Sequence, residues 1–175
     1  FESHFPEQVT HVNRRLVDSE QFWFFMEGRL HEDPAKSLAL LKDLSEEQAH
    51  QFLDTGTVLP CKAGDVVIRP GDVGDEMFLV LEGVAEVWSG DESLSLAVLG
   101  PGQVFGEMAF VSREPRTAKV VAKTDMQLLI LTQGFFKRAT KKMPDIVAQV
   151  LLNLSVVLVE RLRSSTEQWV ASATG

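Results

Sequence analysis

Residues able to bind a small anion lie close together in the segment 105–118. Arg116 offers a planar fork of N–H donors that matches the oxygens of a phosphate group. A helix beginning near Gly106 would aim free backbone N–H groups at the same anion, and a glycine there lets the backbone come close. Ala109 is small and leaves its own N–H accessible. The segment therefore predicts a site for one phosphate-like group.

The same residues also have explanations that need no ligand. Glu107 and Arg116 could form an ion pair that staples a loop, and for two residues taken alone this is the simpler interpretation. Gly106 by itself is more often a turn residue, and Thr117 by itself is more often a strand residue. Only the whole ordered series favours a binding site.

The chain around this segment, from about residue 57 to residue 132, predicts a β-rich unit. Short β-rich runs alternate with glycine turns, which is typical of a sandwich or barrel. No crossover helices separate the runs, so a parallel sheet is not expected. We predict a mainly β fold with flanking helices, built on an antiparallel β jelly-roll barrel. The expected strands are Val66–Arg69, Met77–Leu81, Ala85–Ser89, Leu94–Leu99, Lys119–Ala122 and Gln127–Leu131.

The residues before the barrel predict helices. Phe22–Met26 is a dense apolar cluster that must be buried against the rest of the chain or against another domain. Ser45 and Gln48 have the spacing of a capping box, in which each side chain accepts a hydrogen bond from the other residue's backbone. The apolar residues that follow, Ala49, Phe52 and Leu53, would form one helical face.

The residues after the barrel predict a short helix and then a long one. Phe135, Phe136 and Ala139 mark the short helix, and Pro144 suits the first position of the long helix. The long helix is apolar over more than one face, which favours two packing partners, the barrel and a second copy of the chain. We therefore expect a homodimer formed through this helix. Its apolar positions are Val147, Val150, Leu151, Leu154, Val156, Val157, Leu158, Val159 and Leu162.

Charge and composition exclude several classes of protein. The 175 residues carry a formal net charge of −8, which argues against DNA or RNA as a partner of this chain. Cys61 is the only cysteine, and no Cys/His spacing resembles a zinc site. The longest apolar stretch, Ile146–Val159, is shorter than the roughly 20 residues of a spanning helix, so no membrane insertion is expected. Without a secretory signal pattern, we expect a cytoplasmic domain.

The order of residues in the anion-binding segment resembles a known pattern. Phe105-Gly106-Glu107, then Ala109, six further residues and Arg116-Thr117-Ala118 are similar to the phosphate-binding cassette of the cyclic-nucleotide-binding family, which includes the catabolite activator protein and the regulatory subunits of cyclic-AMP-dependent protein kinase. The resemblance continues upstream through 64–68 and 71–83. It implies a cyclic-nucleotide-binding domain at about 38–170, with the barrel at 57–132 and C-terminal helices at 133–170, after a helical extension at 1–37.

The resemblance implies a sensor of cyclic AMP or cyclic GMP that signals by moving its C-terminal helices. The phosphate would bind Arg116 and the backbone of Gly106, Glu107, Met108 and Ala109. Glu107 would accept a hydrogen bond from the ribose 2′-hydroxyl, since a carboxylate directly beside a phosphate would be repelled. The hydroxyl of Thr117 would reach a phosphate oxygen or a guanine amino group, and is compatible with either nucleotide.

The same resemblance points to the long helix as the part that covers the base. Ser165 and Thr166 are possible base contacts, although solvated positions near a helix end explain them equally well. Trp169 would stack on the base or pack at the end of the chain, and packing is favoured. Arg161 and Arg163 are expected to be solvated. A solvated face also explains the basic cluster Lys137, Arg138, Lys141 and Lys142.

Other functions fit the sequence less well. No kinase, cyclase or phosphodiesterase motif is visible, so we expect no enzyme, no catalytic residue and no cofactor apart from the ligand. A cupin oxygenase needs histidines inside the barrel, whereas the last histidine is His50; a haem sensor would have only Cys61 as a ligand after that point. The chain contains no helix-turn-helix domain after the long helix, so a transcription factor is not expected. A sensor would signal to an output domain outside this chain. The alternative function is a structural or dimerisation module of the same fold with an idle pocket.

Overall fold

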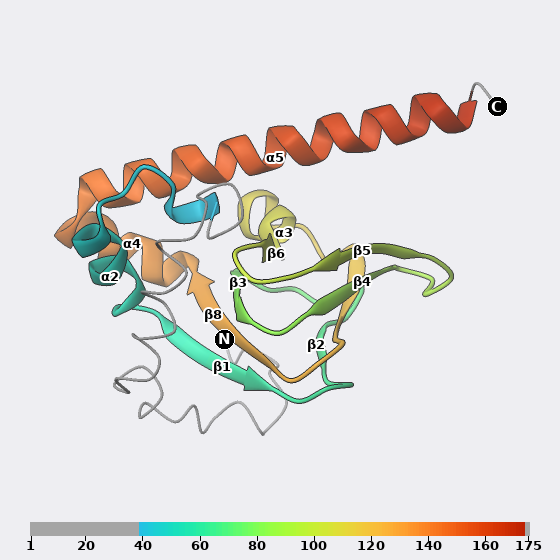
Figure 1. The fold of residues 1–175 in the computed structure, drawn as a ribbon, viewed down its shortest axis with the longest axis horizontal. Helices are drawn as coiled ribbons and strands as arrows, with labels where there is room; N and C mark the ends of the chain where they lie inside the picture. Colours follow the sequence, from blue (N-terminus) through green and yellow to red (C-terminus); the bar gives the residue numbers. More distant parts are fainter. Residues whose placement is uncertain (1–38, 174–175) are drawn as a thin grey trace.

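The computed structural model describes residues 39–173, which form two four-stranded antiparallel sheets flanked by helices (Figure 1). The predicted extension at 1–37, with its cluster Phe22–Met26, lies outside the described residues. One sheet has the order β1-β8-β3-β6 and the other the order β2-β7-β4-β5. The strands are β1 Thr57–Cys61, β2 Val66–Ile68, β3 Glu76–Glu82, β4 Ala85–Ser89, β5 Ser95–Leu99, β6 Val104–Phe105, β7 Ala118–Ala122 and β8 Met126–Thr132.

The predicted antiparallel jelly-roll fold is confirmed. Each of the six expected strands is present, and its ends agree with the prediction to within one residue. Two strands were missed by the sequence analysis: β1, which pairs with β8, and the two-residue β6, which pairs with β3. β1 contains Pro60 and β6 is too short for alternation to show, so neither carries a clear strand pattern.

Strand β3 separates two hydrophobic cores. Its side chains alternate between the faces of the sheet, because successive residues of a strand point in opposite directions. Phe78 and Val80 face the interior of the barrel, where Phe78 stacks on Phe105 with ring centroids 5.1 Å apart. Met77 and Leu79 face the opposite way, into a second core shared with the helices. The first sheet is therefore buried on both sides.

The short helices cover the outer side of this first sheet. A 3-10 helix, η3 (Ala39–Leu41), precedes α2 (Glu46–Leu53), and the predicted capping box at Ser45 and Gln48 is confirmed by both hydrogen bonds, 2.9 and 3.2 Å long. Helix α4 (Gln133–Lys142) follows β8 directly and is capped by the hydroxyl of Thr132. Phe52 of α2 meets Phe135 of α4 edge to face at 5.2 Å, so these aromatic rings join the two helices.

The long helix α5 (Pro144–Ala173) begins at the predicted proline and packs along only its first half. Val147, Val150 and Leu154 are buried, and the buried Asn153 fixes the helix by donating to the carbonyls of Leu40 and Lys42 at 3.0 and 2.7 Å. The second half extends past the barrel above β4 and β5 (Figure 1). Among the described residues, no helix has the length and hydropathy needed to cross a membrane.

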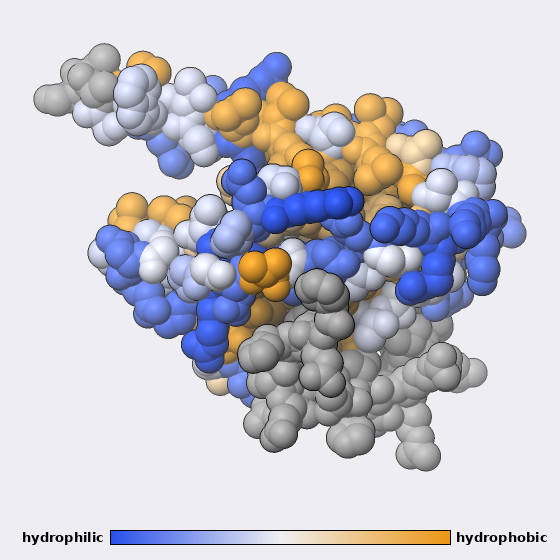
Figure 2. Space-filling view, turned by 180° about the vertical axis from the view of Figure 1, so that it is seen from behind, coloured by the Kyte–Doolittle hydropathy of each residue, from blue (hydrophilic) through white to orange (hydrophobic). Residues whose placement is uncertain are grey.

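Several apolar side chains of α5 remain exposed. Figure 2 shows apolar side chains gathered along this helix, and Leu152, Val156 and Val159 are among those exposed. Leu162 is 68% exposed and Trp169 is 72% exposed. The prediction that Trp169 packs at the end of the chain is therefore wrong, because the helix carries it beyond the barrel and the described residues leave most of its surface uncovered.

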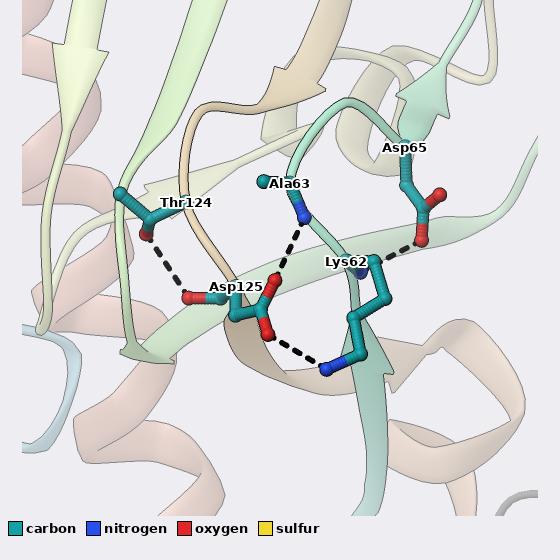
Figure 3. Close-up of polar contacts among 5 residues, drawn as sticks. All are labelled: Lys62, Ala63, Asp65, Thr124 and Asp125. Carbon is teal, nitrogen blue, oxygen red and sulfur yellow. Dashed lines mark hydrogen bonds and ion pairs between the residues drawn. The ribbon is translucent and has the colours of Figure 1, made fainter.

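A group of polar contacts joins two turns at one end of the barrel (Figure 3). The Asp125 carboxylate accepts hydrogen bonds from Lys62 Nζ at 2.7 Å and from the Ala63 backbone N–H at 3.0 Å, while Asp65 accepts from the Lys62 backbone N–H at 2.8 Å. The hydrogen bond with Asp125 raises the pKa of Lys62 and the same bond lowers the pKa of Asp125. These contacts tie the β1–β2 turn to the β7–β8 turn.

Candidate functional site

The segment between β6 and β7 forms the candidate site. Helix α3 (Glu107–Ser112) follows β6 after Gly106, which has the left-handed φ of +77°. A β-carbon at this position would lie 2.9 Å from Arg116 Nη1. Glycine suits this position for both reasons, because other residues adopt this φ at a cost and a β-carbon would force the guanidinium to shift. The chain thereby turns back tightly over Arg116.

Arg116 is buried, with 4% of its side chain exposed, and it is held by protein groups on two sides. Its Nη1 donates to the Gly106 carbonyl at 2.8 Å, and its Nη2 donates to the Glu76 carbonyl at 2.7 Å. Nη2 also lies 3.1 Å from Oε1 of the Glu76 carboxylate. A β-carbon at Gly74 would lie 2.8 Å from Nη2, so the guanidinium is enclosed between two glycines.

Glu107 is also buried, and its partner comes from the long helix. Its Oε1 lies 2.6 Å from Nη1 of Arg161, and Nη2 of Arg161 donates to the Val104 carbonyl in β6. The expectation that Arg161 is solvated is therefore wrong: α5 passes close enough to the site for this arginine to reach the buried carboxylate. The sequence carried no signal for this contact, since position 161 lies far along the chain from position 107. Arg163, two positions on, is exposed as expected.

The simple alternative for Glu107 and Arg116, an ion pair between the two, is not what the structure shows. Arg116 pairs with Glu76 and Glu107 pairs with Arg161, so each charge has a different partner. The four charges sum to zero within a small, largely buried region. This arrangement keeps a buried cation and a buried anion close together, each neutralised by its own partner.

The first turn of α3 lies next to these groups. In a helix the first N–H groups have no partner within the helix, and Gly106 provides no side chain to cap them. Ala109 is buried, whereas Met108 is 61% exposed. Phe110 packs against Phe136 with ring centroids 5.2 Å apart, and its carbonyl accepts from Gln133 Nε2 at 2.9 Å. Helix α3 is thus linked to α4.

The remaining predicted site residues lie at the surface. Thr117 is exposed just before β7. Ser165 and Thr166 are exposed on the projecting half of α5, and the hydroxyl of Thr166 donates to the Leu162 carbonyl of its own helix at 2.8 Å. The structure therefore brings together Gly106, Glu107 and Arg116, and leaves Thr117, Ser165 and Thr166 at the surface.

The chemistry of the cluster is that of binding. Arginine donors and free helix N–H groups attract an anion, and a buried carboxylate accepts from a hydroxyl. Within residues 39–173, no group of three or more His, Cys, Asp or Glu side chains is placed to hold a metal ion. Burial raises the pKa of the Cys61 thiol to about 11, so it is protonated at neutral pH.

Comparison with known proteins agrees with this geometry. The family model described as cyclic nucleotide-binding domain matches residues 58–143, which include the whole segment from Gly74 to Arg116. Over 134 residues (77% of the chain), the sequence is 31% identical to the cAMP-dependent protein kinase regulatory subunit of Aspergillus fumigatus, of which it covers 32%. It is 33% identical over 138 residues (79% of the chain) to a cGMP-dependent protein kinase of Caenorhabditis briggsae, of which it covers 17%.

Solved structures show the same likeness. The catabolite activator protein of Thermus thermophilus superposes with a TM-score of 0.68 and 27% identity, over 77% of this chain and 63% of that one. The chain thus spans a third or less of the length of these two curated relatives.

Proposed function

The chain belongs to the cyclic nucleotide-binding domain family, and from this premise we propose that it binds cyclic AMP or cyclic GMP as a regulatory sensor. The single observation that carries the proposal is the buried Arg116 guanidinium, enclosed by Gly74 and Gly106 beside the first turn of α3. A buried arginine with this support is suited to one anionic group. The proposed role is binding, with no catalytic step, and a cytoplasmic location goes with it.

In the proposed complex the cyclic phosphate lies between Arg116 and the N–H groups of the first turn of α3, from Glu107 to Ala109, with Met108 exposed at its edge. Glu107 accepts a hydrogen bond from the ribose 2′-hydroxyl. Thr117, exposed beside Arg116, adds a hydroxyl to the phosphate or to a guanine amino group. Several charge-assisted hydrogen bonds, each contributing about 1.5–3 kcal/mol, suit micromolar or tighter binding.

The signal would pass through Arg161. This residue connects Glu107 to α5, so a ligand that shares Glu107 acts on the position of the long helix. Movement of α5 toward the barrel would bring Ser165 and Thr166 to the base. Such a change is a population shift, driven by contacts that the ligand makes in only one position of the helix.

The partners we propose are a second copy of the chain and an output domain outside it. The exposed apolar residues Leu152 and Val159, and likewise Leu162 and Trp169, are seven residues apart, the period of a coiled-coil seam. A second α5 packed on this seam would cover them. An output domain is consistent with relatives in which this unit is a third or less of the chain.

One observation favours a second candidate, an idle structural or dimerisation module. Arg116 and Glu107 already have protein partners, Glu76 and Arg161, so a pocket without ligand is electrostatically satisfied. This module would use the same α5 seam and would bind no nucleotide.

Calorimetric titration of the purified chain with cyclic AMP, cyclic GMP and 5′-AMP separates the two candidates. The sensor binds one cyclic nucleotide and not 5′-AMP; a folded chain that binds neither cyclic nucleotide is the idle module. Arg116→Lys keeps the charge but loses the planar fork, and should weaken binding at least tenfold. Arg163→Lys, at an exposed arginine of α5, is the matched control and should bind like the unmodified chain.

A further inference from the structure

The Glu76 carboxylate forms an ion pair with the guanidinium of Arg116, the group to which the phosphate of the proposed ligand would bind. It lies 3.1 Å from Nη2 of Arg116 and is itself largely buried, with 12% of its side chain exposed. A β-carbon at Gly74 would lie 2.6 Å from Oε1 of Glu76, so the carboxylate has room beside Arg116 only because position 74 is glycine. Glu76 is thus an anion already bound at the position where a phosphate would compete for the same donors.

The position of Arg116 does not depend on this carboxylate alone. Two of its hydrogen bonds go to backbone carbonyls, those of Gly106 and Glu76, at 2.8 and 2.7 Å. Both carbonyls belong to regular parts of the fold, since Gly106 caps α3 and Glu76 opens β3 opposite Thr132. Removal of the carboxylate would therefore leave the guanidinium in place and unneutralised.

We propose that Glu76 is a built-in competitor that sets both the affinity and the selectivity of the site. This inference rests on the proposed function and deepens it. With Glu76 present the four charges of the site balance, so a phosphate adds an uncompensated negative charge beside a carboxylate. Only a ligand that makes further contacts, through a ribose and a base, offsets the repulsion between its phosphate and the Glu76 carboxylate. Inorganic phosphate, which has none of them, is excluded.

The test compares Glu76→Gln with the unmodified chain of 175 residues in two measurements. In titrations with the cyclic nucleotides, Glu76→Gln should lower Kd about tenfold, as expected when one charge-assisted contact no longer competes. In thermal unfolding, inorganic phosphate should raise the Tm of Glu76→Gln and leave that of the unmodified chain nearly unchanged. The control Glu114→Gln removes the same charge from an exposed position two residues before Arg116, and should change neither result.

Each outcome has a distinct meaning. Equal or weaker nucleotide binding by a folded Glu76→Gln chain overturns the inference, since a positioning role for Glu76 would produce that result. If neither the unmodified chain nor Glu76→Gln binds a cyclic nucleotide, the proposed function fails. The inference about Glu76 is then tested by thermal unfolding with inorganic phosphate alone. An equal change of Tm in both chains overturns it. Addition of Arg116→Leu to Glu76→Gln should abolish the phosphate response and so assign it to this site.

A second variant guards against a folding defect. Glu76→Asp keeps the charge and shortens the side chain, which weakens the contact with Nη2 while leaving the buried guanidinium neutralised. It should shift Kd and the phosphate response in the same direction as Glu76→Gln, by a smaller factor. If Glu76→Gln does not fold and Glu76→Asp binds like the unmodified chain, the inference is overturned.

Discussion

Glu107 at the start of α3 and Arg161 in the middle of α5 form an ion pair 2.6 Å long, and this contact connects the candidate pocket to the long helix. Arg161 also donates to the Val104 carbonyl, so a single side chain joins α5, α3 and β6. Beyond it the described side chains of α5 are exposed. The pair therefore marks the point at which α5 leaves the body of the molecule.

Loss of this pair should loosen the projecting half of α5. In Arg161→Gln the Glu107 carboxylate loses its cationic partner, and amide hydrogen exchange in residues 155–170 should become faster. The affinity for cyclic AMP should fall several-fold, because Arg161 holds the Glu107 carboxylate that contacts the ribose 2′-hydroxyl. The affinity for 2′-deoxy cyclic AMP, which lacks this hydroxyl, should change little. Arg163→Gln is the control. Exchange as slow in Arg161→Gln as in the control would mean that the pair does not hold the helix.

Substitution by alanine should lower the free energy of unfolding more at Gly106 than at Gly71, a glycine of the same conformation. Gly106 and Gly71 have φ values of +77° and +83°, so alanine is strained at both by about 1 kcal/mol. Only at Gly106 would the β-carbon meet Arg116 Nη1 at 2.9 Å; at Gly71 nothing lies within 4 Å. Urea denaturation should show a larger loss for Gly106→Ala, by about 1–3 kcal/mol. Equal losses would show that the guanidinium moves aside without cost.

The Lys62–Asp125 contact should make stability depend on pH at both ends of the range. The pKa of Asp125 is lowered from 3.8, so its stabilisation is present above that value and is lost as the pH falls through the lowered pKa. The pKa of Lys62 is raised from 10.5, so its stabilisation is present below that value and is lost as the pH rises through the raised pKa. In Asp125→Asn, plots of Tm against pH should flatten at both ends.

Asp91 provides the comparison for this prediction. Hydrogen bonds from Ser89 and Ser93 lower its pKa to about 2, and its described contacts involve no lysine. Asp91→Asn should therefore flatten only the acid end of the same plot. If the plot of Tm against pH is unchanged at its alkaline end in Asp125→Asn, the contact with Asp125 does not stabilise the charged form of Lys62 in solution.

The apolar seam of α5 should hold two chains together. Val159→Glu places a charge in the middle of the exposed positions Leu152, Leu162 and Trp169, where burial against a second helix would be costly. Sedimentation equilibrium should show a dimer for the unmodified chain and a monomer for this variant. Val98→Glu, at an exposed apolar position of β5, is the control and should remain dimeric. A monomeric unmodified chain would refute the proposed dimer.

Local patterns accounted for most of the fold. The spacing of Ser45 and Gln48 predicted their reciprocal hydrogen bonds, because a capping box depends on residues three positions apart. Pro144 predicted the start of α5 for a similar reason, since its fixed φ suits the first helical turn. Alternation and glycine turns located six strands, and failed only for β1 and β6, where a proline or shortness hid the pattern.

The sequence by itself determined the antiparallel jelly roll, the long terminal helix and the resemblance of the segment 105–118 to a phosphate-binding cassette, because each depends on residues near one another in the chain. Only the tertiary structure decided the charge pairs. Arg116 pairs with Glu76, 40 positions away, and Arg161, which pairs with Glu107, also reaches the Val104 carbonyl, 57 positions away. No local rule selects such partners; they follow from the sheet register that places β3 beside the cassette and from the packing that directs α5 over it.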